Sequence, residues 1–243
     1  MPKITFLGTR GNIEAKTKRH NNHSILLIEY KKTKILIDWG LDWLKKRKKL
    51  DAIRPHAIFI THAHPDHAEG LKHGAPYPVY ATTDSWKTMK KYPIDEKITI
   101  KKNQKITIGS IDIQAFPIVH SIISPAVGYK ITMGKHIIFY VSDLITIIDE
   151  KKALAGVQIY IGDGASLTQP IIRYRDGIPM GHTTIKNQII WCAQEKVPMA
   201  IFTHCGSQIV KGDGRTLGAQ IRELGKKYGI NAKLAYDGMC IEL

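Results

Sequence analysis

The sequence predicts an α/β (α+β) protein in which two mixed β-sheets pack face to face with helices outside, an αββα sandwich. Three observations predict this fold class. Short β-branched runs bounded by turn residues recur along the 243 residues, which is typical of strands. Segments with apolar residues three or four positions apart interrupt these runs and predict helices. No linker, low-complexity segment or short-period repeat divides the chain, so we expect one domain over residues 1–243.

The candidate strands are rich in Val, Ile, Thr and aromatic residues and lie between Gly, Pro, Asn or Lys turns. They form two halves, each with strands first and helices after. Both sheets have to bury one face, and packing them against each other satisfies both. In order, the runs are KITFLG (3–8), SILLIEY (24–30), TKILIDW (33–39), AIFITH (57–62), PVYAT (78–82), KITIKK (97–102), KITIG (105–109), IDIQAF (111–116), AVGYKITM (126–133), HIIFYV (136–141), VQIYIG (157–162) and MAIFTH (199–204).

Helical spacing appears in four segments, 41–50, 83–92, 183–197 and 214–229. The last of them is amphipathic and lies between strands of the C-terminal segment. Its residues Leu217, Ile221 and Leu224 can share one apolar face. Packing, rather than chemistry, is the expected role of this segment.

The chain is strongly basic, with 36 Lys and Arg against 21 Asp and Glu, a formal charge of +15. Lysine clusters such as 45–49 and 101–105 attract polyanions, nucleic acid first among them. A lysine-rich surface of the kind found in heat-adapted proteins is the alternative explanation. No segment approaches the roughly 20 apolar residues of a membrane span, and MPKITFLGTRG lacks the apolar region of a signal peptide. We therefore expect a cytoplasmic protein with no membrane partner.

The stretch THAHPDHAEG crowds four metal-seeking side chains into six residues: His62, His64, Asp66 and His67. Pro65 favours an extended His64 and suits the first turn of a helix. His62 and His64 can then project to the same side. Asp66 and His67 are adjacent in that first turn, where they diverge and can serve a second ion. Imidazole and carboxylate ligands suit zinc, with manganese or iron as alternatives.

Other potential ligands follow the ends of further candidate strands: Asp38, His120, Asp143 and His204. Loops at strand ends, held by a rigid scaffold, are where sites are usually built. Taken singly, each residue would be an ordinary half-buried histidine or a turn-forming aspartate. The repeated placement favours one shared site. The cysteines lack CxxC spacing, which argues against a thiolate zinc site or a disulfide framework. The remaining histidines lack such support and are expected to be structural or exposed: His20, His23, His56, His73 and His136.

HAHPDH matches the HxHxDH signature of the metallo-β-lactamase fold superfamily, and the strand-end residues resemble its other elements in the same order. The resemblance covers residues 4 to about 207 and implies two Zn²⁺ ions. It implies a first ion held by His62, His64 and His120. It implies a second ion held by Asp66, His67 and His204. Asp143 would bridge the two ions, and Asp38 would orient a ligand histidine through a hydrogen bond. A metal-bound water would be the nucleophile of such a hydrolase.

Three further stretches resemble the branch of that superfamily that contains tRNase Z and related phosphodiesterases. They are FLGTRGN followed by KTKRHNNHSILL, IGDGA (161–165) and GHTT (181–184). The resemblance implies that His182 and Asp163 are catalytic together with Asp66. A histidine held by a carboxylate can give a proton to the leaving oxygen. The alternatives are a His182 that merely begins a helix and an Asp163 that merely forms a turn.

The chain also departs from that branch. Only 22 residues separate His120 from Asp143, too few for the long flexible arm with which many tRNase Z proteins grip tRNA. The usual PxKxRN loop is matched only in part by EAKTKRHN, and Asp163 occupies the position where glutamate is usual. The sequence therefore predicts a zinc-dependent phosphodiesterase or nuclease that cleaves RNA or DNA without this arm, with a homodimer as one expected assembly. A small-molecule hydrolase, either a β-lactamase or a cyclic or phosphonate-type phosphodiesterase, is the alternative. A binding module without catalysis would need lost ligands, and every expected ligand is present.

Overall fold

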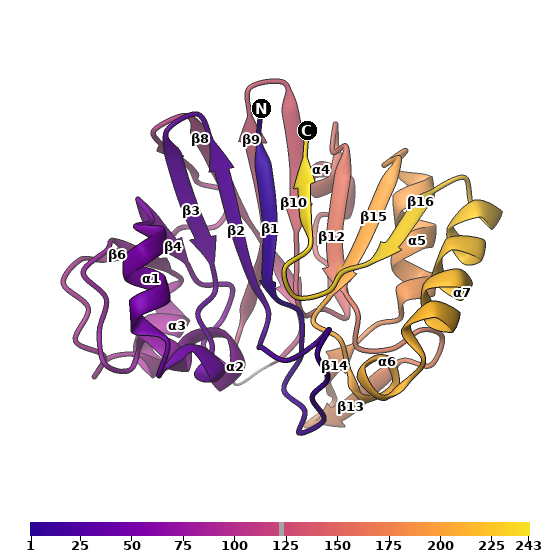
Figure 1. The fold of residues 1–243 in the computed structure, drawn as a ribbon, viewed down its shortest axis with the longest axis horizontal. Coiled ribbons are helices and arrows are strands. Elements are labelled where there is room, and N and C mark those ends of the chain that lie inside the picture. The colour runs from indigo at the N-terminus through magenta and orange to yellow at the C-terminus, as the bar shows by residue number, and fades with distance from the viewer. Residues whose placement is uncertain (122–123) are drawn as a thin grey trace.

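Two mixed sheets pack face to face in this computed structural model, which describes residues 1–121 and 124–243 (Figure 1). The first sheet has the strand order β17-β1-β2-β3-β4-β5-β6. Its strands are β1 (Lys3–Gly8), β2 (Ile25–Tyr30), β3 (Thr33–Ile37), β4 (Ala57–Phe59), β5 (Val79–Ala81), β6 (Lys97–Thr99) and β17 (Cys240–Glu242). Pairing is antiparallel from β17 to β3 and parallel from β3 to β6. The C-terminal strand therefore lies beside the N-terminal one.

The second sheet has the order β11-β8-β9-β10-β12-β15-β16, with β7 also paired to β8. Its strands are β7 (Lys105–Ile108), β8 (Ile111–Val119), β9 (Ala126–Met133), β10 (His136–Tyr140), β11 (Thr146–Ile147), β12 (Ile159–Asp163), β15 (Met199–Thr203) and β16 (Asn231–Leu234). β8, β10, β12 and β15 run in the same direction, because β9 is antiparallel to both of its neighbours and the later pairs are parallel. Their carboxyl ends consequently meet at one edge of the sheet. Outside both sheets, β13 (Ile171–Arg175) and β14 (Ile178–His182) form a separate hairpin.

Three apolar layers hold the sandwich together. Phe6, Tyr129 and Ile138 belong to the layer between the sheets, where successive inward-facing residues of both sheets meet. The outer face of the first sheet packs with Trp39, Leu50 and other apolar residues in a second cluster. A third cluster joins the second sheet to its helices. The predicted αββα sandwich is thus confirmed.

The helices cover the outer faces of the two sheets (Figure 1). Beside the first sheet are the 3₁₀ turns η1 (Leu41–Trp43) and η2 (Glu69–Leu71) and the helices α1 (Arg47–Ile53), α2 (Pro65–Ala68) and α3 (Thr83–Thr88). Beside the second sheet are α4 (Glu150–Leu154), α5 (Ile185–Gln194), α6 (Ser207–Lys211) and α7 (Gly214–Lys227). None of the helices in the described ranges is long and apolar enough to span a membrane.

Most predicted elements occur where the sequence places them. Every predicted run contains a strand, and α7 buries Leu217 and Ile221 with Leu224 partly buried, as its periodicity predicts. The predicted helix 41–50 is wrong in its bounds, because η1 ends at Trp43 and α1 begins only at Arg47. The reason is tertiary: the Trp43 side chain is buried, and its Nε1 donates to the His23 carbonyl over 3.2 Å. The hairpin β13–β14 was not predicted.

Candidate metal centre

The residues of HAHPDH follow β4 and enter α2. His64 is extended (φ −66°, ψ 153°) and Pro65 opens the helix, as the sequence predicts. His62 Nε2 and His64 Nδ1 lie 2.9 Å apart and face the same point. Asp66 and His67, in contrast, do not diverge: Asp66 Oδ2 lies 3.2 Å from His67 Nε2. The orientation of the His67 ring is set by the hydrogen bond from its other nitrogen, Nδ1, to Asp38.

A first cluster of imidazoles is formed by His62, His64 and His120, whose candidate ligand atoms all lie within 4.8 Å of one another. His120 follows β8 directly, and its Nε2 lies 3.4 Å from His64 Nδ1. Its other nitrogen donates to the Gly181 carbonyl over 3.0 Å. That bond fixes which nitrogen of His120 faces the cluster.

A second cluster contains Asp66, His67 and His204. His204 follows β15 and has a left-handed backbone (φ 52°), which a non-glycine residue adopts mainly where surrounding contacts hold it. Those contacts are backbone hydrogen bonds from Gly11 to the Cys205 carbonyl and from Cys205 to the Thr9 carbonyl. They bring His204 Nε2 to 3.1 Å from Asp66 Oδ2.

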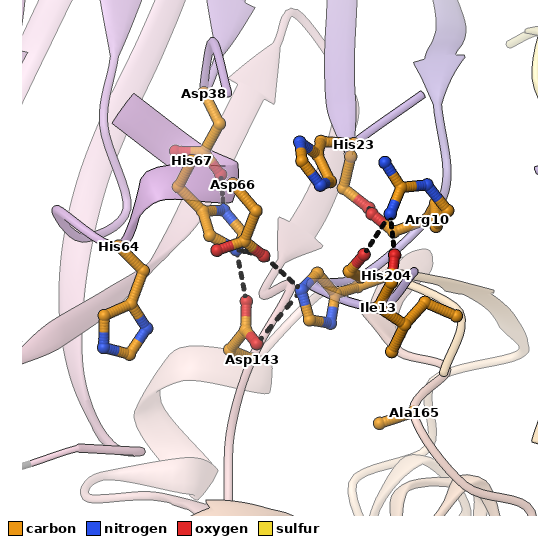
Figure 2. A network of polar contacts seen from close by, with 12 residues as sticks. Arg10, Ile13, His23, Asp38, His64, Asp66, His67, Asp143, Ala165 and His204 are labelled. Atoms are coloured by element: carbon orange, nitrogen blue, oxygen red, sulfur yellow. Dashed lines mark hydrogen bonds and ion pairs between the residues drawn. The ribbon is translucent and has the colours of Figure 1, made fainter. Parts of the chain in front are cut away.

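Asp143 lies between the two clusters. Its Oδ2 is 2.8 Å from His67 Nε2, and its Oδ1 is 3.3 Å from His204 Nε2 and 4.0 Å from His120 Nε2. Figure 2 shows the carboxylate pointing at His67 and His204, with His64 on its other side. Asp143 follows β10 and His120 follows β8, so the common direction of these strands places both residues at one edge. The Asp143 carboxylate thus lies within 4.0 Å of imidazole nitrogens from both clusters.

The chemistry of these residues fits bound divalent metal ions. Within the described ranges, His67 Nε2, His204 Nδ1 and Asp143 Oδ2 are buried without a hydrogen-bond partner of suitable geometry. Three carboxylates, from Asp38, Asp66 and Asp143, surround the single imidazole of His67. Against the effect of burial, these charges raise the pKa of His67 well above its ordinary value. Such an excess of buried negative charge requires a cation, and a metal ion can replace the proton.

The imidazoles of the first cluster are in the form that binds metal. Burial lowers the pKa of His64 to about 4, with the neighbouring His120 acting in the same direction. Burial likewise lowers the pKa of His62 well below its ordinary value. Neutral imidazole is the ligand form. Nitrogen and oxygen donors without a thiolate suit zinc, manganese or iron. Burial raises the pKa of the Cys205 thiol, which keeps this neighbour of His204 protonated.

Asp38 makes the contact that the resemblance implies. The His67 Nδ1–H donates to Asp38 Oδ2 over 2.8 Å, which directs Nε2 towards Asp66 and Asp143. The other carboxylate oxygen accepts from the Thr61 backbone N–H over 2.8 Å. Asp38 is fully buried at the end of β3, in a left-handed conformation (φ 65°). Asp38 therefore orients the candidate ligand His67 through the nitrogen that faces away from Asp66 and Asp143.

His182 and Asp163 form a close pair beside Asp143. The His182 Nδ1–H donates to Asp163 Oδ2 over 2.7 Å, and the same nitrogen lies 3.5 Å from Asp143 Oδ1. Burial opposes protonation of His182, but the charge and hydrogen bond of Asp163, together with Asp143, raise its pKa to about 9. His182 ends β14 and does not begin a helix, because Thr184 is the N-cap of α5. Asp163 also accepts from the Ala165 N–H over 2.7 Å. It therefore makes the local contact of the alternative turn role and also bonds His182.

Comparison with known proteins agrees with this geometry. A family model described as "Beta-lactamase superfamily domain" matches residues 33–205. The chain belongs to the β-lactamase superfamily. Its matched relatives include ribonuclease Z of Methanopyrus kandleri, 28% identical over 147 residues, which are 54% of this chain and 50% of that protein. Exodeoxyribonuclease YycJ of Bacillus anthracis is 29% identical over 114 residues, 42% of this chain and 43% of that protein. The chain thus matches half or less of the length of these curated relatives.

Several solved structures share the fold over nearly the whole chain. The metallo-β-lactamase fold protein YhfI from Bacillus subtilis has a TM-score of 0.78 at 19% identity, covering 100% of this chain and 99% of that one. A diphosphatase from the PhnP family has a TM-score of 0.76 at 19% identity, covering 100% and 98%. The short form of human tRNase Z has a TM-score of 0.66 at 18% identity, covering 99% and 98%. At these identities the likeness establishes the fold alone.

Two features of this β-lactamase-superfamily site were missed by sequence reasoning. Both border a cavity of about 520 Å³ that is also lined by residues of the two clusters. One wall is the N-terminal loop, where buried Arg10 pairs with Asp42. Arg10 also donates to the Ile13 carbonyl (Figure 2). Gly11 in this loop approaches so closely that an added Cβ would lie 2.9 Å from His204 Cε1. The other wall is β13–β14, which contributes Ile171 and Arg173. The sequence signals near these walls are FLGTRGN for the first and GHTT, whose Gly181 and His182 end β14, for the second.

Proposed function

We propose that this chain is a dinuclear metal-dependent phosphodiesterase that hydrolyses nucleic acid. One observation supports this more than any other: the Asp143 carboxylate lies between two histidine-containing clusters, and the His182–Asp163 pair stands 3.5 Å from it. Hydrolysis of a phosphodiester needs negative charge stabilised on phosphate oxygens and a proton given to the leaving alkoxide. The two clusters and the adjacent pair supply places for these two tasks.

The residues divide this work by position. Two divalent ions, for which we propose zinc with manganese or iron as alternatives, would supply Lewis-acid chemistry and a nucleophilic water. They would be held by His62, His64 and His120 on one side and by Asp66, His67 and His204 on the other, with Asp143 shared. His182 has its Nδ1 bonded to Asp163, so its Nε2 is left to hold a proton towards the cavity. The raised pKa of His182 keeps that proton available near neutral pH.

Asp163 maintains this arrangement in two ways. Its charge compensates the imidazolium, and its backbone-bound carboxylate fixes the ring orientation through the 2.7 Å bond. The Leu144 N–H also donates to it over 3.2 Å. An aspartate, one methylene shorter than the glutamate usual in this branch, is sufficient here because β12 brings the Asp163 backbone close enough for its carboxylate to bond His182.

Nucleic acid is the proposed substrate because of charge and of the named relatives. The formal charge of +15 favours association with polyanions. Two matched relatives are named as a ribonuclease and an exodeoxyribonuclease. Binding of this kind weakens steeply with salt as counterions are released.

A small-molecule hydrolase is the second candidate, and two observations favour it. Residues 126–133 and 136–140 between His120 and Asp143 are the strands β9 and β10, so they provide no long arm for gripping a folded RNA. The cavity of about 520 Å³ is also of a size that small ligands occupy. The single domain, the cytoplasmic location and the homodimer stay predictions.

The test is hydrolysis by protein loaded with zinc or manganese at low salt. Substrates are labelled single-stranded RNA, single-stranded DNA, bis(p-nitrophenyl) phosphate and a chromogenic β-lactam. We expect phosphodiester cleavage that Asp143→Ala abolishes. His182→Ala should slow it by about 10²–10⁴-fold while metal content is unchanged. Exposed His73 supplies the matched control His73→Ala. Metal-loaded protein that cleaves no phosphodiester contradicts the proposal, and cleavage of the β-lactam alone establishes the second candidate.

A further inference from the structure

The hairpin β13–β14 presents one face to the cavity. Its register pairs Ile171 with His182, Arg173 with Met180 and Arg175 with Ile178. Alternate residues of a strand lie on the same face, and directly paired residues share it, so these six side chains form one face. The cavity is lined from this face by Ile171, Arg173 and His182. Met180 lines a second pocket, which these three residues also border. The proposed proton donor is therefore the first member of a row that continues outward along the hairpin.

This face combines cationic and apolar side chains that are accessible to a ligand. Ile171 is 44% exposed and Ile178 is 47% exposed, unusual values for large apolar residues in this chain. In the described part of the chain, no carboxylate forms an ion pair with Arg173. Arg175 has only Asp176, next in sequence, at 4.0 Å. Exposed apolar surface beside exposed guanidinium groups suits a ligand with both bases and phosphates.

We propose that the His182 face of β13–β14 binds the leaving-group segment of a single polynucleotide strand, with Arg173 on its first phosphate beyond the scissile one. This inference rests on the proposed function. His182 is placed to protonate the leaving oxygen, so the strand that continues from this oxygen starts at the His182 end of the hairpin. From the Ile171–His182 pair, Arg173 is about 7 Å and Arg175 about 14 Å further along. Such spacing allows successive phosphates to be contacted.

The face selects a single strand over a duplex. Ile171, Met180 and Ile178 can contact only bases whose planes or edges are accessible, as they are in an unpaired strand. The arginines contact phosphates without reading sequence. The face therefore binds RNA or DNA strands of any sequence, and the discrimination between RNA and DNA is left to the residues around the scissile phosphate.

The test compares substrates of increasing length with Arg173→Ala in zinc-loaded protein. Bis(p-nitrophenyl) phosphate, a dinucleotide and a 15-nucleotide single strand are used, as RNA and as DNA. We expect the loss in kcat/KM to grow with length and to reach about tenfold for the long strand, mainly in KM. Arg173→Lys should recover part of it. Anisotropy with a hydrolysis-resistant phosphorothioate strand should show weaker binding and a salt dependence reduced by about one unit of slope.

Two matched controls are available in the chain. Tyr174 lies on the opposite face of the same hairpin and is 73% exposed, so Tyr174→Ala should behave as wild type. Arg222 is an exposed arginine of α7, and Arg222→Ala removes the same charge at a remote position. Both variants should keep the length dependence of the wild type.

The outcomes separate this inference from the function on which it rests. Protein that hydrolyses no phosphodiester contradicts the proposed function. Hydrolysis with an equal effect of Arg173→Ala on every substrate length overturns the binding face alone. Equal effects of Arg173→Ala and Arg222→Ala overturn it as well, because the contribution is then general charge. The proposal is also overturned if the wild type is a dimer, Ile178→Asp is a monomer, and the two bind the strand equally well. The face then contacts a second copy of the chain instead of a nucleic-acid strand.

Discussion

The floor and the rim of the cavity differ in how their side chains are held. The pocket floor comprises the candidate ligands and Asp143, most of them buried: His62, His64, Asp66, His67, His120, Asp143 and His204. Several floor histidines have a fixed partner on the second nitrogen, such as Asp38 for His67 and the Gly181 carbonyl for His120. The pocket rim comprises residues 9–23 and β13–β14. Its hairpin is exposed and joined to neither sheet. A preorganised floor determines the chemistry, whereas the rim determines what reaches it.

The largest effect is expected where the floor is broken. Asp143→Asn keeps the size of the side chain and removes the charge shared by both clusters. We expect wild type to bind about two zinc ions per chain and the variant to lose at least one, with activity falling more than about a hundredfold. Metal content and hydrolysis of bis(p-nitrophenyl) phosphate measure this. Asp176→Asn, in the exposed turn of the hairpin, is the matched control. A variant that keeps full metal content and activity would show that Asp143 is no ligand.

A smaller effect should follow when the support of the floor is changed without removing a ligand. Asp38→Asn cannot offer two carboxylate oxygens to His67 and to Thr61, so the His67 ring loses its fixed tautomer. We expect zinc affinity about 10–100-fold lower, with a stoichiometry still at the wild-type value. Competition with a chromogenic zinc chelator measures it. Unchanged affinity would mean that packing around His67 is sufficient to orient its ring. Asp95→Asn, at an exposed position, is the control and should bind zinc like the wild type.

The contrast between floor and rim also explains what the sequence could reveal. Floor residues follow strands whose β-branched runs are local signals, and parallel strand directions then place their ends together. The hairpin gives no such signal, because Pro179 and Gly181 are poor strand residues. Its second strand is held by a tertiary contact, in which the backbones of Gly181 and His120 bond over 2.9 Å and the His120 ring bonds the Gly181 carbonyl. The ion pair of buried Arg10 with half-buried Asp42 joins residues far apart in sequence and has no local pattern either.

The behaviour of Asp66 and His67 shows the same limit at the floor itself. Helical geometry alone predicts that neighbouring side chains diverge, but Asp66 Oδ2 and His67 Nε2 lie 3.2 Å apart. Asp38, contributed by another strand, turns the His67 ring back towards Asp66. The spacing in the sequence therefore predicts which residues are candidate ligands, whereas the orientation of the His67 ring depends on a residue 29 positions away.

The smallest expected effect concerns how the rim is attached to the fold. His20 is buried in the N-terminal loop, where its Nδ1 lies 2.8 Å from Thr9 Oγ1, and Thr9 in turn donates to Asp237 over 2.7 Å. Burial, aided by the charge of Arg19, lowers the pKa of His20 to about 4. Between about pH 6.5 and pH 4 the unfolded chain binds a proton at this residue that the folded chain does not. Acidification through this window therefore removes stability, and raising the pH restores it.

His20→Gln should flatten this pH dependence. The wild type should lose about 1–2 kcal/mol more unfolding free energy than the variant between pH 7 and pH 4.5, after allowance for partial solvent access. Denaturant unfolding of metal-free protein at the two pH values measures it, with exposed His73→Gln as the control. At pH 7 the variant should still bind zinc like the wild type, because the hydrogen bonds of His20 within the described residues are to Thr9 and Thr17 of the N-terminal loop. Equal pH dependence in the two proteins would mean that His20 protonates freely in the folded loop, and that the rim is less firmly attached than its contacts indicate.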